Sequence, residues 1–395
     1  MEACFDVVVC GGGIAGIAAA LAASRTGAKT CLLEREYALG GLATLGLIVI
    51  YLPLCDGAGV QMSAGISEEL LKLSLKYGPG TIPAAWSNPY GSREERAQDR
   101  YAVEYQAAPL IIAAEEALLA EKVSLLYTAQ LSAATVKSGQ LTSVFIETKT
   151  GRREIRGKAF VDATGDADLC FFAGEPTFDD RTNRRTGWYY SFDGQNLKLH
   201  QQTDPLYGDL PASARTYSGT DIEAVTQHCI DSRKMILEHV QSLRQAGSSQ
   251  AYPLIIPHYH GLRMTRRLAG AFEFSEDHHE GVWFEDAIGM IGNWKEKGKR
   301  YSIPYRSIRA VGTGNLYAAG RCSCADKSGW DLTRVIPTCA VTGEAAGTAA
   351  ALQAAGGNAP TWAVLQNKLV SNGVLLDESL FQTRMSVNCL ESPDE

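Results

Sequence analysis

The stretch "VVVCGGGIAG", residues 7–16, decides the fold. Its first half continues a short β-branched apolar run over residues 5–10, which is typical of a buried parallel strand. Three glycines follow in the spacing G-x-G-x-x-G, at Gly11, Gly13 and Gly16. A glycine-rich turn after a strand is common, so its meaning depends on the residues that come next.

The segment after the glycines completes a β-α-β unit. Residues 14–23 are rich in alanine and leucine, which predicts a helix that ends at Gly27. Residues 29–33 form a second apolar run, which predicts a strand, and Glu34 follows directly. An acid after the second strand is part of the dinucleotide-binding fingerprint.

Each residue of this unit has a physical task in holding a dinucleotide. Gly11 permits a tight turn, Gly13 lets the backbone approach a pyrophosphate, and Gly16 lets the helix pack closely on the strand. The positive end of the helix stabilises the phosphate charge. Glu34 accepts hydrogen bonds from ribose hydroxyls and disfavours a 2′-phosphate, which argues against NADP. NAD and FAD both use this fingerprint, and these residues alone do not separate them.

The rest of the chain carries further segments that belong with such a unit. The adjacent Gly40 and Gly41 let the backbone pass close to a bulky flat group. Alternating runs bounded by turn residues predict a strand and then a small β-meander. The expected strands cover residues 123–127, 132–136, 143–148 and 153–156, then 159–162 before "ATGD", and finally 314–320. An Ala-rich helix is predicted after Pro337.

Length, charge and cysteine usage define the class of protein. A chain of 395 residues is longer than one core usually serves, so we expect two domains. The net charge of −7 gives no general attraction to nucleic acid or anionic membranes, and no apolar run is long enough to span a membrane. We expect a cytoplasmic protein without a signal peptide or a metal site. Its ten cysteines are expected to be reduced, with a redox role for Cys322 and Cys324 as a minor alternative.

In this order, the motifs resemble the FAD-binding domain of the glutathione-reductase-type flavoproteins. The segments that carry the resemblance are "CGGGIAGIAAALAASRTG", "GGLATLGL", "VDATGDADL", "IPYRSI", "NLYAAGRC" and "RVIPTCAVTGEAAG". Over residues 6–376 the chain is similar to the FAD-dependent oxidoreductase family, which is allied to the fumarate reductase and succinate dehydrogenase flavoproteins. The resemblance implies an α/β fold, with a Rossmann-like FAD-binding domain of parallel sheet and β-meander and an inserted α+β substrate domain. It implies non-covalent FAD, because "GGLATLGL" holds no histidine for a covalent link.

The resemblance also implies domain boundaries. We expect a discontinuous FAD-binding domain at residues 1–170 and 303–382, a substrate or cap domain at 171–302, and a mobile polar tail at 383–395. Residues 76–101, rich in Pro, Gly and charge, are interpreted as an excursion that serves as a lid or an oligomer contact.

The candidate cofactor-binding residues follow from the same motifs. They are Gly11, Gly13, Ile14, Ala15, Gly16, Glu34, Arg35, Gly41, Leu42, Ala43, Gly165, Asp166, Gly320, Arg321, Asp326, Pro337 and Thr338. Arg321 stands where many relatives carry an acid that contacts the ribityl chain, and Asp326 is the candidate replacement. The N–H groups of Thr338 and the residues after it are expected to point at the N1/C2-carbonyl edge of the flavin, where a helix N-terminus stabilises negative charge.

The substrate pocket is expected between the meander and the last FAD strand. The proposed catalytic residues are His258, Arg263, Arg266 and Arg334, the last with Asp331 beside it. Arginine can bind a carboxylate through two parallel hydrogen bonds, and histidine can transfer a proton near neutral pH. An alternative of equal weight is a structural cluster in which Arg263, Arg266 and Arg267 pair with Glu273, Glu276 and Asp277. Aromatic stretches at 187–195 and 281–294 and an amphipathic helix over 220–246 complete the region.

Three functions stay open on the sequence alone. The first is a dehydrogenase or oxidase that moves a hydride from a small polar or anionic molecule to FAD. The second is a fumarate-reductase-like reductase of an activated double bond. The third is an electron-transfer subunit of a larger redox complex, although the chain has no Cys₄ run for an iron–sulfur cluster. The expected partner is a small-molecule substrate, and a homo-oligomer and a redox partner protein are left open.

Overall fold

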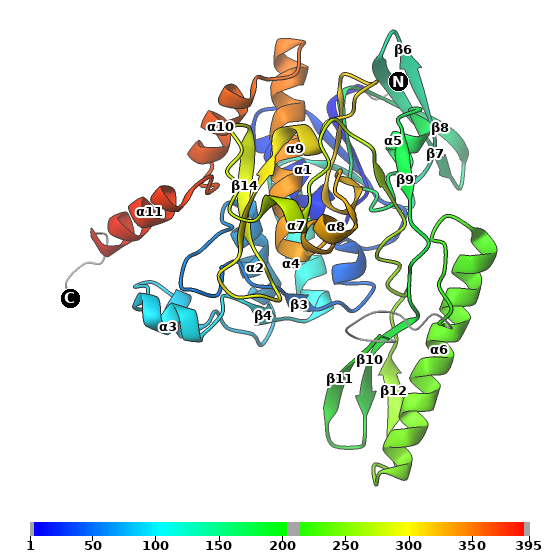
Figure 1. Ribbon diagram of the computed structural model, residues 1–395. Coiled ribbons are helices and arrows are strands. Elements are labelled where there is room, and N and C mark those ends of the chain that lie inside the picture. Colours follow the sequence, from blue (N-terminus) through cyan, green and yellow to red (C-terminus); the bar gives the residue numbers. More distant parts are fainter. Residues whose placement is uncertain (1–3, 204–213, 391–395) are drawn as a thin grey trace.

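The computed structural model describes residues 4–203 and 214–390, and Figure 1 shows their arrangement. Its main sheet has the strand order β5-β2-β1-β8-β7-β6, and β16 pairs with β8 as well. Strands β5, β2, β1, the end of β8 and β16 are parallel, whereas β6, β7 and the start of β8 form an antiparallel meander. The predicted α/β class, with its parallel sheet and meander, is therefore confirmed. The bounds are β1 Cys4–Cys10, β2 Thr30–Leu33, β5 Ser124–Leu126, β6 Gln130–Lys137, β7 Gln140–Thr148, β8 Gly151–Asp162 and β16 Leu316–Ala318.

One strand, β8, belongs to both parts of this sheet. Its first part pairs antiparallel with β7 and its last part pairs parallel with β1. The prediction of two separate strands, over residues 153–156 and 159–162, is wrong because β8 continues through Gly157. Gly157 lies opposite Phe5, and a Cβ on it would come 2.8 Å from Val8 Cγ2. The glycine serves close packing inside a continuous strand.

Two helices, α1 and α9, pack against each other near the centre of the molecule (Figure 1). They span Ile14–Arg25 and Ile336–Gly356. A Cβ on Gly343 would lie 2.2 Å from Ala15 O, and one on Gly347 would lie 2.0 Å from Ala19 O, so the two backbones touch. Both helices are buried on almost every side, which explains why their sequences are rich in alanine and lack a polar face.

A separate sheet and a long helix project from this body (Figure 1). The sheet has the order β11-β10-β12, and the helix α6 packs on β10. The predicted amphipathic helix over 220–246 is confirmed as α6. By contrast, the hairpin β14–β15 packs through β14 on α9. The bounds are β10 Thr186–Phe192, β11 Leu197–Thr203, β12 Tyr252–Ile255, α6 Ile222–Gln245, β14 Ala287–Gly292 and β15 Arg300–Pro304. The domain boundaries proposed from the sequence stay a prediction.

The remaining elements surround the two helices and the sheet. They are β3 Ile50–Tyr51, α2 Ile66–Leu75, α3 Arg93–Gln98, β4 Val103–Glu104, α4 Ala107–Ala120, α5 Asp168–Phe172, β9 Thr177–Asp179, β13 Arg266–Leu268, α7 Glu276–His279, α8 Lys327–Thr333 and α10 Trp362–Ser371. Within the excursion 76–101, Trp86 is buried and stacks on Tyr101 at 5.2 Å, so this segment packs on its own chain. No single described helix is long and apolar enough to cross a membrane; α8 and α9 meet both conditions only as a pair bent by 86°.

The C-terminal segment differs from the predicted mobile tail. A helix, α11, spans Glu378–Leu390. Arg384, at the start of the expected tail, forms an ion pair of 2.7 Å with the buried Glu68 of α2. The polar composition of this segment reflects ion pairing as well as solvent exposure, and composition alone does not distinguish the two. Residues 391–395 lie outside the described residues.

Candidate active site

The turn after β1 uses its three glycines in different ways. Gly11 has a φ of +101°, and a Cβ on it would lie 2.4 Å from Ala163 O. A Cβ on Gly16 would lie 1.7 Å from Gly11 O, so this glycine permits the close packing that its spacing predicts. A Cβ on Gly13 would meet no atom within 4 Å. The fold itself requires Gly11 and Gly16, whereas the space over Gly13 is open to a ligand.

A cavity of about 330 Å³ starts at this turn and extends to the start of α9 and to β10 and β11. It is lined by many of the predicted residues: Gly11, Gly13, Ile14, Ala15, Glu34, Arg35, Gly41, Leu42, Ala43, Gly165, Arg263, Arg321 and Arg334. Other predicted residues are not in its wall: Gly16, Asp166, His258, Arg266, Gly320, Asp326, Pro337 and Thr338. The structure thus brings both ends of the expected site into one space, and the individual ligand contacts stay predictions.

Glu34 is held rigidly at one end of the cavity. Its side chain is buried, with 6% of the residue exposed. The carboxylate accepts hydrogen bonds from the N–H groups of Gly12, at 2.6 Å, and Glu36, at 2.8 Å. Burial raises the pKa of Glu34, and these two hydrogen bonds oppose that shift. A carboxylate has about four acceptor positions, so two remain for ribose hydroxyls.

Arg321, the residue that replaces the expected acid, crosses the "ATGD" turn. A Cβ on Gly165 would lie 2.3 Å from its Nη2, so only glycine leaves room for the guanidinium there. Arg321 donates to Leu262 O at 2.5 Å, and its Nη2 lies 3.5 Å from Asp166 Oδ1. Asp166 therefore pairs with Arg321 and does not itself line the cavity. The cavity receives a positive charge at this point.

The start of α9 differs in detail from the prediction. The helix begins at Ile336 with Val335 as its N-cap, so Pro337 occupies the second helical position. Val335, Ile336 and Cys339 line the cavity, whereas Pro337 and Thr338 do not. The N–H of Cys339 donates to Val335 O at 2.9 Å, so it is used within the helix. The prediction that the N–H groups after Thr338 face the cofactor is wrong for Cys339.

Two further predicted cofactor residues have structural tasks. Asp326 is the N-cap of α8 and accepts from the N–H of Gly329 at 2.7 Å, which explains its place outside the cavity. Gly320 has a φ of +64° and donates its N–H to Thr342 Oγ1 at 2.9 Å. Asp326 therefore does not replace the missing acid in the cavity wall.

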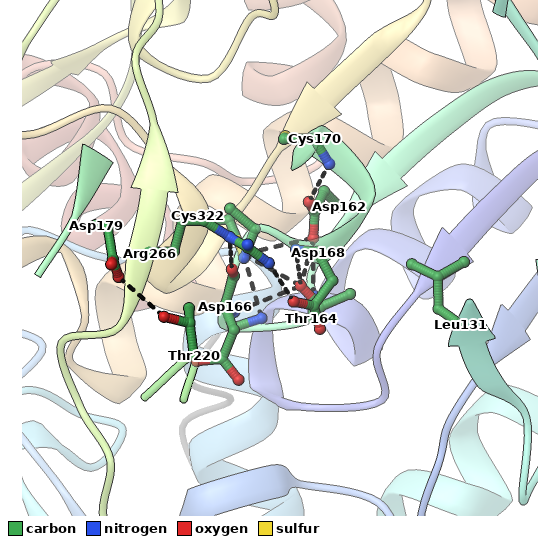
Figure 2. A network of polar contacts seen from close by, with 12 residues as sticks. Leu131, Asp162, Thr164, Asp166, Asp168, Cys170, Asp179, Thr220, Arg266 and Cys322 are labelled. Atoms are coloured by element: carbon green, nitrogen blue, oxygen red, sulfur yellow. Dashed lines mark hydrogen bonds and ion pairs between the residues drawn. The ribbon is translucent and has the colours of Figure 1, made fainter. Parts of the chain in front are cut away.

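Two of the proposed catalytic side chains point elsewhere. Arg266 donates to Asp168 Oδ1 at 2.6 Å and lies over the Phe171 ring at 4.3 Å, as part of the polar network that Figure 2 shows. His258 lies on the surface, with 60% of its side chain exposed, and its Nε2 is 2.9 Å from Glu36 Oε2. The structural alternative therefore describes Arg266 better than a catalytic role does, although its partner is Asp168 and not one of the three acids considered.

Figure 2 also shows the surroundings of Cys322. Its buried sulfur accepts from the N–H groups of Gly165, at 3.1 Å, and Ala167, at 3.3 Å. Burial raises the pKa of this thiol well above its usual range. Cys322 and Cys324 are both free, buried thiols, which does not favour the redox role considered for them.

Arg263 and Arg334 reach the cavity from two different segments. Arg263 is partly buried, with its Nε shielded from solvent, and among the described residues its guanidinium has no hydrogen-bond or ion-pair partner. Burial and the nearby Arg334 lower the pKa of Arg263 to about 9. Arg334 forms an ion pair with Asp331, while its Nε is buried without a partner. This end of the cavity therefore carries a positive charge that nearby carboxylates do not balance.

Several residues that line the cavity were not predicted from the sequence. Trp188, Gln201, Tyr259 and Trp294 line the space near the arginines and the glycine turn. Trp188 and Trp294 belong to the two aromatic stretches, and Tyr259 lies between the two histidines of the chosen segment. The aromatic enrichment was a usable signal, because binding cavities are rich in aromatic side chains. Nothing in the sequence marks Gln201.

The cavity suits a dinucleotide on structural grounds. The N-terminus of α1 has no side-chain cap, and its first residues line the cavity next to the open space over Gly13. A phosphate group there would meet free N–H donors and the positive end of the helix. Glu34 and Arg321 add an acceptor for ribose and a cation for phosphate on either side. The residues present therefore fit FAD.

Comparison with known proteins identifies the family. Residues 6–188 and 188–369 match the family model described as FAD dependent oxidoreductase. Among solved structures, p-nitrophenol 4-monooxygenase PnpA from Pseudomonas putida DLL-E4 is similar with a TM-score of 0.52 and 14% identity, over 100% of this chain and 91% of that chain. A geranylgeranyl bacteriochlorophyll reductase-like protein from Thermoplasma acidophilum gives 0.49 and 11%, over 98% and 87% of the two chains. The likeness to PnpA supports the fold. The chain belongs to the FAD-dependent oxidoreductase family, and it is an enzyme whose cofactor is FAD.

Proposed function

We propose that the protein transfers a hydride between a small polar or anionic organic substrate and non-covalently bound FAD. The observation that carries this proposal is the single cavity that joins the glycine turn at Gly13 to the arginines Arg263 and Arg334. A flavin enzyme needs its substrate in van der Waals contact with the flavin ring, so a shared cavity is the required arrangement.

The cofactor and the protein chain have different tasks in this reaction. When bound, FAD accepts the two electrons and the hydrogen that leave a C–H bond as hydride, while the adjoining O–H or N–H loses its proton to solvent. Ala43 and Ile336, both in the cavity wall, provide apolar surface for a flat ring. The N-terminus of α9 places a positive helix end at the cavity, which stabilises negative charge on a bound group. Among the described residues, no histidine lines the cavity, which supports a non-covalent cofactor.

The test is anaerobic reduction of the purified holoprotein. Candidate hydroxy acids, amino acids and polyols are mixed with the protein, and the main visible absorbance band of the flavin is followed. Bleaching by one class of C–H donor supports the proposal. If no donor bleaches the flavin, but activated alkenes reoxidise the chemically reduced protein, the fumarate-reductase-like alternative replaces it. If neither occurs and only a protein partner exchanges electrons, the electron-transfer alternative replaces it.

The flavin link has its own test. Acid or heat should release about one FAD per chain, and a flavin-labelled peptide after denaturation would contradict non-covalent binding. A cytoplasmic location, a homo-oligomer and a redox partner protein stay predictions.

A further inference from the structure

Three hydrogen-bond donors near the arginine end of the cavity lack acceptors. Arg263 Nε, Arg334 Nε and Trp188 Nε1 are each buried without a partner among the described residues, and all three side chains line the cavity. Buried donors of native proteins are nearly always paired, because an unpaired buried polar group costs about 1–3 kcal/mol. Three such donors around one space indicate an occupant that supplies acceptor oxygens.

The charges in this region also favour a bound anion. Asp331 is shared between Lys295 and Arg334, so one carboxylate faces two cations. Arg263 forms no ion pair among the described residues and feels the charge of Asp331 only at longer range, and its low pKa of about 9 still leaves it protonated at neutral pH. A buried cation without a counter-ion is strongly unfavourable. A bound anion supplies the missing negative charge.

Much of the cavity wall is apolar. The indole rings of Trp188 and Trp294 and aliphatic side chains surround the space, which therefore suits a flat or hydrocarbon body better than a hydrated sugar or a phosphate. The aliphatic residues are Ile48, Ile50, Leu52 and Val335.

We propose that this end of the cavity binds the carboxylate of an organic acid with an aromatic or apolar body, with Arg263 and Arg334 as its ion-pair partners and Trp188 as a further donor. A planar guanidinium matches the two oxygens of a carboxylate, and two guanidinium groups can hold both oxygens at once. The inference deepens the proposed function, because it names the substrate class of the same site.

The test uses two redox-inert probes of the same shape, one with a carboxylate and one with a neutral amide. Benzoate and benzamide are titrated into the holoprotein, and binding is measured from the perturbed flavin spectrum and by calorimetry. We expect benzoate to bind at least about 10-fold more tightly than benzamide, since a hydrogen-bonded ion pair contributes about 1.5–3 kcal/mol. Equal binding of the two probes, or no binding of benzoate, overturns the proposal.

Variants then assign the contact to residues. Arg263→Gln and Arg334→Gln should each weaken benzoate binding on the order of 10- to 100-fold, and Trp188→Phe by a few-fold. The matched control is Arg152→Gln, at an exposed arginine of β8, which should leave binding unchanged. If Arg263→Gln does not fold, Arg263→Lys is used instead: it keeps the charge and loses the planar guanidinium, so weaker benzoate binding in it still assigns the two-oxygen contact to Arg263.

The outcomes separate this inference from the proposed function. Benzoate binding that depends on Arg263, together with a flavin that no donor bleaches, supports the carboxylate site and contradicts hydride transfer. If Arg263→Gln and Arg334→Gln lose FAD itself, as measured by the flavin-to-protein absorbance ratio, the arginines serve the cofactor and the carboxylate proposal fails.

Discussion

The two ends of the cavity are built in different ways. At the glycine turn the wall is mostly backbone: Gly11 and Gly16 allow main-chain contacts that no side chain permits, and Gly13 leaves open space. At the other end the wall is made of large side chains such as Trp188 and Arg263, which come from separate segments. A site made of backbone can be recognised from a short stretch of sequence. A site made of side chains from separate segments depends on contacts that form only in the folded chain.

The titratable groups show the same division. All seven histidines of the chain lie in residues 200–279, and none lies in the segments that form the main sheet. Burial lowers the pKa of His200 and His260 to about 4. The region around the side-chain end should therefore lose stability in mild acid, as these histidines become protonated. Four predictions test this contrast, from the largest expected effect to the smallest.

The largest effect is expected from two glycine substitutions. Gly13→Val puts a side chain into open space at an extended backbone position, so the chain should fold normally while FAD binding weakens by more than ~10-fold. Gly16→Ala places a Cβ 1.7 Å from Gly11 O and should destabilise the fold by about 3 kcal/mol or more. Flavin content and circular dichroism measure the two effects. A Gly13→Val protein with full flavin content would contradict the open-space argument.

The second effect concerns acid stability. His260 is 2% exposed, and its Nδ1 lies 2.7 Å from Thr186 O. Because its folded pKa of about 4 is below the usual 6.5, the unfolded chain binds more protons between these values. Its contribution is complete above pH 6.5 and is lost as the pH falls towards 4, by on the order of 3 kcal/mol in all.

Urea unfolding at pH 7.5 and pH 5, with hydrogen exchange to locate the change, measures this loss. We expect exchange to rise first in β10 and β12. His260→Gln keeps a donor for the Thr186 carbonyl without titrating there, so its stability should vary less with pH. An equally steep pH dependence of stability in that variant would show that groups other than His260 cause it.

The third effect concerns the adenosine ribose. Glu34→Ala removes a buried carboxylate and should weaken FAD binding on the order of 10-fold, because a charge-assisted hydrogen bond contributes about 1.5–3 kcal/mol. Glu36→Ala is the control, since the Glu36 carboxylate contacts the surface residue His258. Flavin dissociation constants from fluorescence measure both. Unchanged FAD affinity in Glu34→Ala would place the ribose contact elsewhere.

The smallest effect is expected where the two ends meet. The Tyr259 hydroxyl lies 3.3 Å from the position that a Cβ on Gly41 would occupy, and Gly13 Cα lies 3.3 Å from the same position. A hydrogen bond from this phenol to a bound phosphate should strengthen FAD binding a few-fold, and Tyr259→Phe should remove that gain. Tyr37→Phe, at an exposed tyrosine, is the control. Equal flavin affinity in Tyr259→Phe and wild type would show that the Tyr259 hydroxyl does not contribute to FAD binding.

The backbone end of the cavity could be predicted from the sequence, whereas most of the side-chain end could not. The β-α-β unit was predictable because Gly11, Gly16 and Glu34 act over short sequence distances. Arg266 was not, because its partner Asp168 lies 98 residues earlier and only the folded sheet brings them together. Trp188 was visible only as part of an aromatic stretch, since composition does not show which ring faces a cavity. The continuity of β8 was missed because its two halves pair with different strands, β7 and β1, and the sequence does not show these partners.

The contact between α1 and α9 has a consequence for synthesis on the ribosome. α1 leaves the exit tunnel early, yet the helix that covers it is encoded at Ile336–Gly356. At 5–20 residues per second, the roughly 310 residues between them take on the order of 15–60 s to translate. For that time α1 presents an uncovered apolar surface, which is the kind of segment that chaperones bind. We therefore expect truncated chains that end before α9 to aggregate or to remain chaperone-bound.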